Sequence, residues 1–467
     1  MKIGKILLLC VCLLSFGVKA QRDYKVTFFI HDYQYDSIYI EGYEGGDNIM
    51  LDSVVISKDG GFHTTLKDCM QGMYMVKSKK GDMFSFLLDR DSSFTIEVYQ
   101  DGEFFVENSP QNDAYFLYQR ENKKVQMAMY YYRIKASAKD ANVDSLRKDI
   151  MEVMDSFERF QESFFHTYPN NLITVITMGM NQSAPSYFFE NGKLKQGKEK
   201  EYAYYYRQHY WDKFHFEDIR ILYSPYFIKQ FDTYISEITP QQVDSICLAI
   251  DEFVKVADSR KGREYADYVL SWYMQNLSKL PFSFNEIIYT NLANKYMSRL
   301  EKFLLPSVVE YHKEMVKNLT PFLPNKQMPN IVLRDFKGNT QSLYSVKHKY
   351  TVLYFFSTSC ESCKKDLEDL KRFYKEEKEK YDVEIYSIDV EPDYAICKAR
   401  QEADPYEWIV THASKEELDP YNFNLNHTPT LYVLDENKKV INKTAIYDHV
   451  GQTIKIDYEN KQIEGKK

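Results

Sequence analysis

The sequence predicts a multidomain protein with an N-terminal all-β sandwich or barrel, a central all-α domain and a C-terminal α/β domain. A chain of 467 residues is too long for one ordinary hydrophobic core. Short strands separated by glycine turns give way to helical periodicity, and beyond a proline-rich stretch strands alternate with helices. The expected parts are a signal peptide at 1–20, a small antiparallel β domain at 21–109, an α-helical domain at 110–320 and the α/β domain at 321–467.

The N-terminus has the pattern of a secretory signal peptide. Two lysines precede an apolar stretch at 6–18, and Ala20 offers a small residue for cleavage. The apolar stretch is short for a membrane span, so we expect the mature chain to be exported. Lipoprotein processing at Cys10 or Cys12 is the alternative, although it would leave an unusually short apolar region before the cysteine.

The first domain is predicted by alternation and turns. The segment "FTIEV" at 94–98 alternates apolar and polar residues, as a half-buried strand does. Glycine turns at 58–61, 79–82 and 100–103 suit hairpins. These features favour an antiparallel sandwich or barrel.

The second domain is predicted by helical spacing. In "TPQQVDSICLAIDEFVKVA", apolar residues recur on one stripe, with Thr239 as a candidate N-cap and Pro240 at the first helical position. Cys247 falls on this stripe and is expected in the core. A basic run at 191–207 is interleaved with tyrosines, but the formal charge of −8 gives no general attraction to phosphate backbones. We therefore expect a solvated loop there that leads into a helix, and no nucleic-acid partner.

The third domain follows three prolines at 320–330 that suggest an extended linker. The near-continuous apolar run "YTVLYFF" is typical of a strand buried in a parallel sheet. A helix is expected at 361–380, a central strand at 383–390, and a strand, turn and strand at 428–441.

Two cysteines, Cys360 and Cys363, stand where the buried strand meets the helix. After signal cleavage five cysteines remain, an odd number that excludes complete pairing within the chain. A structural zinc site would need two further ligands at suitable spacing, and none is evident, so no metal is expected. Two incidental thiols are the other alternative. A helix N-terminus favours a thiolate, so Cys360 is expected to be the nucleophile and Cys363, one turn on, the resolving thiol.

Residues from about 328 to 445 resemble the TlpA/ResA-type exported thiol–disulfide oxidoreductases, which have a thioredoxin fold. The resemblance rests on "MPNIVLRDFKGNTQSLYSV", "CESCKKD" and "NLNHTPTLYVLD" in this order. It implies a cis bond before Pro429, substrate-chain pairing by Thr428, and Asp366 as a proton acceptor for Cys363. A solvated helix position is the alternative for Asp366. The resemblance also implies protein thiol or disulfide substrates, a membrane-bound electron donor and no cofactor.

The chain departs from this family at several positions. Ser359 stands where the family usually has tryptophan, before the first cysteine, and Ser362 stands where it often has proline, before the second. Tyr354 stands where cytosolic thioredoxins carry a buried aspartate. The order of a β domain, a helical domain and this C-terminal domain is similar to exported proteins of Bacteroidota, with residues 216–246 resembling their helical module.

The sequence is compatible with three functions. The favoured one is a periplasmic reductase of protein disulfides. A non-catalytic scaffold, with recognition carried by the helical domain, is the alternative because more than half of the chain lies outside the redox domain. A peroxidase of the peroxiredoxin type is less favoured, since those enzymes need threonine where Ser357 stands, three residues before the cysteine.

Overall fold

The structure is a computed structural model that describes residues 21–137, 143–180, 184–190, 193–276, 285–302, 304–421, 428–444 and 448–464. Its contacts divide the chain into two compact units, Met1–Val269 and Leu270–Lys467. The signal peptide expected at 1–20, including Cys10 and Cys12, lies outside the described residues. The domain boundaries expected from sequence stay predictions.

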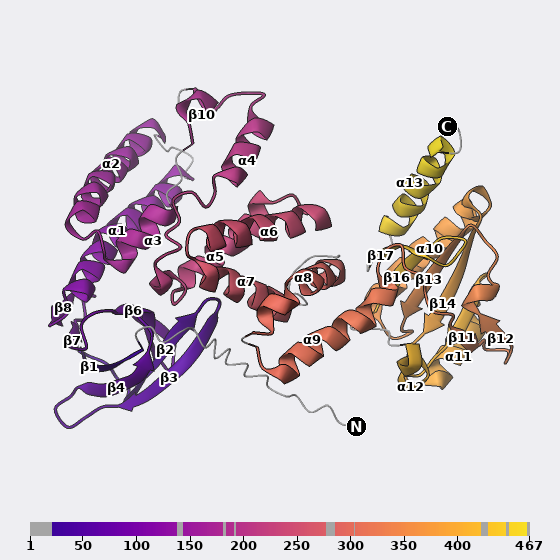
Figure 1. The fold of residues 1–467 in the computed structure, drawn as a ribbon, viewed down its shortest axis with the longest axis horizontal. Coiled ribbons are helices and arrows are strands. Elements are labelled where there is room, and N and C mark those ends of the chain that lie inside the picture. The colour runs from indigo at the N-terminus through magenta and orange to yellow at the C-terminus, as the bar shows by residue number, and fades with distance from the viewer. Residues whose placement is uncertain are drawn as a thin grey trace. The chain divides into compact units, whose positions relative to one another are not determined.

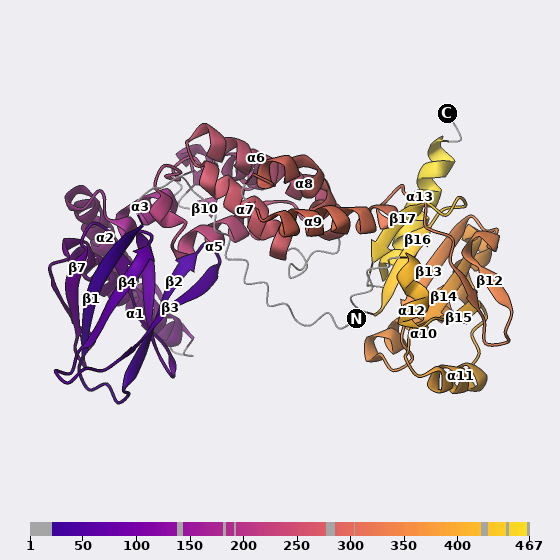
Figure 2. The same cartoon turned by 60° about the horizontal axis from the view of Figure 1, so that its bottom comes forward.

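The first unit begins with two four-stranded sheets, ordered β4-β1-β7-β8 and β3-β2-β5-β6 (Figures 1 and 2). Neighbouring strands are antiparallel except for β1 and β7, which run parallel. The strands are β1 (Arg22–Ile30), β2 (Ser37–Glu44), β3 (Asp47–Val55), β4 (Phe62–Cys69), β5 (Gly72–Ser78), β6 (Gly81–Leu88), β7 (Ser93–Val98) and β8 (Phe104–Glu107).

The two sheets form the predicted sandwich. On β7, Phe94 and Ile96 are buried, as the alternating pattern predicted. Phe28 on β1 meets Phe86 on β6 edge to face, with ring centroids 5.2 Å apart, so the core joins both sheets. Gly60 and Gly102 take φ values of 84° and 83° in two of the predicted turns, a conformation that favours glycine.

Helices complete the first unit. The helical region predicted from residue 110 is confirmed, but it also contains a small two-stranded sheet of β9 (Phe189–Glu190) and β10 (Lys193–Leu194). The central core of the helical region is aromatic, with Trp211 packed against Phe253 at a centroid distance of 4.9 Å. The helices are α1 (Pro110–Ala136), α2 (Val143–Thr167), α3 (Leu172–Met180), α4 (Glu199–Gln208), α5 (Pro225–Thr233), α6 (Val243–Ser259) and α7 (Arg263–Asn276), the last of which crosses into the second unit.

Helix α6 begins three residues later than its sequence predicts. Thr239 is not its N-cap: the Thr239 hydroxyl donates to the carbonyl of Tyr234 at 2.8 Å and closes a short π-helical turn. Gln242 is the N-cap residue instead, without a side-chain capping bond. Cys247, expected in the core, is only half-buried.

A buried amide joins helix α1 to the sandwich. Asn112 accepts from the backbone N–H of Leu87 at 2.7 Å and donates to the Leu87 carbonyl at 2.8 Å. These bonds imitate the pairing of a neighbouring strand at the end of β6, which would otherwise leave two buried backbone groups unsatisfied.

The second unit contains a five-stranded sheet ordered β15-β14-β13-β16-β17. Strands β13, β14 and β15 are parallel, and β16 and β17 are antiparallel to their neighbours. This mixed sheet confirms the predicted α/β class. Its strands are β13 (Tyr350–Phe356), β14 (Val383–Asp389), β15 (Ile409–His412), β16 (Thr430–Leu434) and β17 (Val440–Thr444), and a hairpin of β11 (Val332–Arg334) and β12 (Thr340–Ser342) precedes them.

Both faces of this sheet are covered. Helices α10 (Glu361–Tyr381) and α13 (Asp448–Glu464) share one apolar cluster with β13 and β14. The other face packs against the segment around Met328 and the β11–β12 hairpin. This burial on both sides explains why every residue of β13 is buried and why its sequence reads as one apolar run.

The proline-rich segment at 320–330 is not the extended linker that the sequence predicts: Thr320–Phe322 form a 3-10 turn, and the residues after it pack onto the sheet. The N–H of Asn325 donates to the carbonyl of Val440, and the N–H of Met328 donates to the carbonyl of Lys438, both at 2.8 Å. Residues 325–328 therefore form part of the α/β domain.

Two helices precede this segment in the second unit, α8 (Asn285–Leu300) and α9 (Pro306–Leu319). They share a buried contact between the Tyr289 hydroxyl and His312 Nδ1, 2.6 Å apart. Lys443 Nζ, on β17, lies 2.7 Å from both carboxylate oxygens of Glu286 on α8. The sheet thus has a direct ionic contact with the helical segment.

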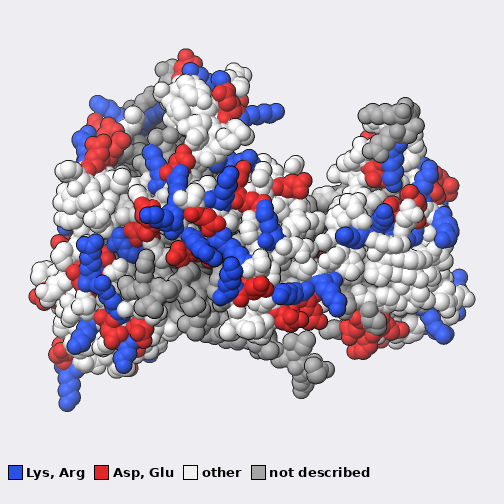
Figure 3. All heavy atoms as spheres, in the orientation of Figure 1, with Lys and Arg blue, Asp and Glu red and all other residues white. Residues whose placement is uncertain are grey.

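Within the described residues, no helix is both long enough and apolar enough to span a membrane. On the face drawn in Figure 3, basic and acidic side chains are interspersed.

Candidate redox site

The candidate site lies where β13 ends and α10 begins. Strand β13 ends at Phe356, three polar residues follow, and Cys360 is the N-cap of α10. The backbone N–H of Cys363 points to Cys360 Sγ at 3.3 Å. A sulfur in this position lies at the positive end of the helix dipole, where a thiolate is favoured.

The two sulfurs differ in access. Cys360 and Cys363 are joined in a disulfide with Cα atoms 5.3 Å apart. Cys363 is 2 % exposed, whereas Cys360 is only partly buried. A substrate can therefore reach the first cysteine of the pair and not the second.

Residues far apart in the sequence complete the site. Strand β16 pairs with β13, with Thr430 opposite Phe355, and this places the preceding Thr428–Pro429 segment beside the cysteines. The Thr428 carbonyl oxygen lies 3.5 Å from Cys360 Sγ. The Thr428–Pro429 bond is cis, as the resemblance implied.

Asp366 lies on α10 and is half-buried. Burial, and next the charge of Asp366, raise the pKa of Tyr354. The Tyr354 hydroxyl in turn donates to the backbone carbonyl of Cys363 at 3.4 Å. Asp366, the expected proton acceptor for Cys363, therefore lies near Tyr354, whose hydroxyl contacts the backbone of that same cysteine.

Two carboxylates at the end of β14, Asp389 and Glu391, belong to the site but were not predicted from the sequence. Asp389, 2 % exposed, accepts from the backbone N–H of Thr358 at 3.2 Å and also from the Thr358 hydroxyl. Glu391 accepts from the hydroxyls of Ser357 and Ser359. Asp389 ends β14 and Glu391 follows it, at the carboxyl edge of the parallel strands, which is where α/β proteins place their sites. This position was the signal that the sequence offered.

Helix α11 (Tyr394–Ala403) places Cys397 beside this network without joining the redox pair. Its thiol is buried and lies 3.3 Å from the Asp393 carbonyl. Burial, followed by the charge of Asp389, raises the pKa of Cys397 to about 12. The expectation that Cys397 is a packing residue agrees with this environment.

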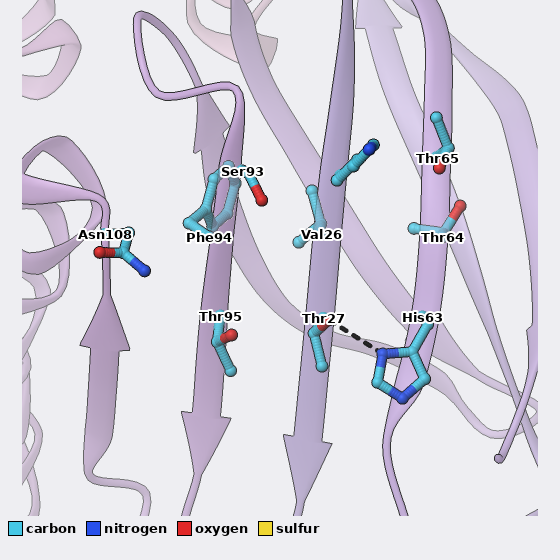
Figure 4. A pocket seen from close by; sticks show the side chains of 10 residues that line it. Val26, Thr27, His63, Thr64, Thr65, Ser93, Phe94, Thr95 and Asn108 are labelled. Atoms are coloured by element: carbon cyan, nitrogen blue, oxygen red, sulfur yellow. Dashed lines mark hydrogen bonds between the residues drawn. The ribbon is translucent and has the colours of Figure 1, made fainter.

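A separate hollow of about 400 Å³ lies on the outer face of the first unit's β4-β1-β7 sheet (Figure 4). Threonine and serine side chains line it, and Thr27 is 3.0 Å from His63 Nδ1. It contains none of the candidate site residues. In the parts of the chain that the structure describes, no group of three or more His, Cys, Asp or Glu side chains is arranged to hold a metal ion.

Comparison with known proteins identifies the C-terminal domain. Residues 324–444 match the model of the AhpC/TSA family. Over 119 residues the chain is 28% identical to the thiol-disulfide oxidoreductase ResA of Bacillus cereus, covering 25% of this chain and 67% of that protein. The ResA of Bacillus thuringiensis is 30% identical over 117 residues, with 25% and 66% covered. Residues 324–444 form an AhpC/TSA-family, thioredoxin-like domain.

The thioredoxin-like domain spans about two thirds of the length of these curated relatives. The chain thus has homologues among the thiol–disulfide oxidoreductases and carries a cysteine pair, so the expected enzyme class is confirmed at the level of the family. On the N-terminal side of the thioredoxin-like domain, residues 194–315 match DUF5106, a domain of unknown function.

Two solved structures are also similar to the chain. A thioredoxin-like protein from Bacteroides caccae is 19% identical with a TM-score of 0.46, covering 59% of this chain and 97% of that one. A domain of a possible thiol-disulfide isomerase from Cytophaga hutchinsonii is 26% identical with a TM-score of 0.28, covering 30% and 97%.

Proposed function

We propose that this protein is an exported, periplasmic reductase of protein disulfides. Cys360 is the nucleophile and Cys363 the resolving thiol. The unequal access of the two sulfurs carries the proposal, because a dithiol cycle needs one sulfur that a protein substrate can reach and one that attacks from within.

The cycle starts from the reduced pair. The Cys360 thiolate attacks one sulfur of a substrate disulfide; a bond forms between these sulfurs, and the other substrate sulfur leaves as a thiolate. Cys363 then loses its proton to Asp366 and attacks Cys360 Sγ. The Cys360–Cys363 disulfide forms, and the second substrate thiolate leaves. The substrate has gained two electrons, and the enzyme must recover them from a dithiol donor, which we assign to the membrane.

Thr428 and Pro429 are proposed to bind the substrate chain. The Thr428 carbonyl oxygen lies 3.5 Å from Cys360 Sγ. An extended substrate segment that pairs with Thr428 would therefore bring the substrate disulfide to the nucleophile. The substrate is recognised through its backbone, which suits an enzyme that acts on several proteins.

The test is a redox titration of the mature chain with dithiothreitol or glutathione, read by alkylation mass shifts, together with insulin reduction. Wild type should cycle with a reducing potential, and Cys360→Ser should lose turnover. Cys247→Ser, on helix α6, is the matched control and should keep it. Asp366→Asn should slow release of the mixed disulfide by at least about tenfold.

The competing functions give different results. An oxidising potential would reverse the direction of electron flow. Peroxide consumption that exceeds insulin reduction would favour a peroxidase. Insulin turnover that survives Cys360→Ser, or a cysteine pair that never cycles, would favour the alternative function, a non-catalytic scaffold with recognition in the helical region.

A further inference from the structure

One carboxylate oxygen binds both serines of the loop before the nucleophile. Glu391 Oε2 accepts from the Ser357 hydroxyl at 2.6 Å and from the Ser359 backbone N–H at 3.3 Å. The Ser359 hydroxyl donates to the same oxygen. Ser359 directly precedes Cys360 and replaces the tryptophan usual at this position, so the family's bulky side chain is exchanged here for a bond to Glu391.

This carboxylate is buried and carries its charge at neutral pH. Glu391 is 9 % exposed. The hydroxyls of Ser357 and Ser359, in that order, hold the pKa of Glu391 below its usual value. A negative charge is therefore fixed against Ser359, the residue that precedes the nucleophilic cysteine.

The other charged groups nearby do not neutralise it. The described residues place no lysine or arginine in salt-bridge contact with Glu391, and the His412 ring contacts its backbone carbonyl at 2.9 Å, not its carboxylate. On α10, Lys364 lies 2.5 Å from Glu361, and Lys365 is exposed. Other titratable groups around the loop and the cysteine are Tyr354 on β13, Asp366 on α10, Asp389 at the end of β14, Asp393 and Cys397 on the α11 side, and Tyr406 in the described residues after α11.

We propose that Glu391 is a positioning residue that also sets the redox bias of the pair. It holds residues 357–359 so that Cys360 stays at the N-terminus of α10, and its charge opposes formation of the Cys360 thiolate. This inference rests on the proposed function and assigns a cause to its reducing direction.

The charge acts on only one redox state. Reduction breaks the Cys360–Cys363 bond and adds two electrons and two protons, and at higher pH Cys360 then loses one of these protons. The disulfide carries no charge, so Glu391 leaves it unaffected, whereas the ionised dithiol is destabilised by a like charge. The pair is consequently a better electron donor than it would be beside a neutral residue.

Geometry provides a clean test. Because the Glu391 bonds all converge on one oxygen, the amide oxygen of Glu391→Gln can accept the same donors while the charge is lost. Glu391→Ala removes both the bonds and the charge. Glu402→Gln, an exposed carboxylate on α11, is the matched control for loss of one charge.

The first measurement is the pKa of Cys360 in the reduced full-length protein, read from the pH dependence of iodoacetamide alkylation at its peptide. Because Glu391→Gln removes a nearby like charge, it should lower this pKa by about one unit. Glu402→Gln should leave it unchanged.

The second measurement is the reduction potential as a function of pH. Wild type and Glu391→Gln should agree at low pH, where both thiols are protonated. Above the Cys360 pKa the Gln variant should be less reducing by about 30 mV, which is the equivalent of a tenfold change for two electrons. A purely structural role would not produce this divergence with pH.

An unchanged or raised Cys360 pKa in Glu391→Gln would overturn the inference, as would a potential difference independent of pH. The alkylation readout needs no turnover. If wild type fails to reduce insulin while the pKa still falls in Glu391→Gln, the proposed function fails and the electrostatic role of Glu391 stands.

Discussion

The second carboxylate of the loop, Asp389, allows a prediction about stability. Its Oδ1 accepts from the backbone N–H groups of Thr358 and Glu391, at 3.2 and 3.1 Å, and its Oδ2 accepts from the Thr358 hydroxyl. Asp389→Ala leaves the buried N–H of Glu391 without this acceptor, which costs about 2 kcal/mol, and the half-buried Thr358 adds about 1 kcal/mol. We expect a loss of about 3 kcal/mol.

Asp389→Asn is the control that separates hydrogen bonding from charge. An amide oxygen can keep both bonds to Oδ1, and the amide nitrogen can donate to the Thr358 hydroxyl. This variant should lose less than about 1 kcal/mol.

Calorimetry of the full-length protein gives the answer. A 3 kcal/mol loss in a unit of this size lowers the midpoint of its transition by about 6–12 °C. A shift below about 2 °C for Asp389→Ala would show that the carboxylate does not hold the loop. An equal loss for Asn and Ala would show that charge, and not the acceptor positions, accounts for the effect.

Three further predictions concern the rest of the fold. Asn112→Ala should cost about 2–4 kcal/mol in a urea titration, because both backbone groups of Leu87 lose their buried partner. Burial lowers the pKa of His312, so the neutral ring's contribution to folding stability is complete above about pH 6.5 and is lost as pH falls. Melting curves between about pH 5 and 8 should show this loss of stability, and His312→Gln should abolish the pH dependence. Lys443→Met should cost about 1 kcal/mol by breaking the contact with Glu286, and wild type should lose part of this stability in about 1 M salt.

The elements that the sequence predicts well are those with a strong local pattern. The burial of Phe94 and Ile96, and the complete burial of β13, follow from alternation and from a continuous apolar run. The cysteine pair is found for the same reason: a strand, a short loop and a helix are all visible within one short segment.

The elements that it predicts poorly depend on contacts between distant residues. Thr239 has the composition of an N-cap, but a preceding π-helical turn uses its hydroxyl, so α6 starts later. Glu391 contacts a loop more than thirty residues earlier, and no local spacing reveals that bond. Cys247 follows the apolar stripe but sits at its margin, where helical periodicity alone does not decide depth.

The contact between Lys443 and Glu286 bears on what a working fragment of this protein must include. The match to the AhpC/TSA family model covers residues 324–444, yet the compact unit that contains it begins at Leu270. A fragment cut at the edge of the shared sequence would lose α8, α9 and the carboxylate that meets β17. The matched family domain and the compact unit therefore begin at different residues, and we expect limited proteolysis to release a product that starts well before residue 324.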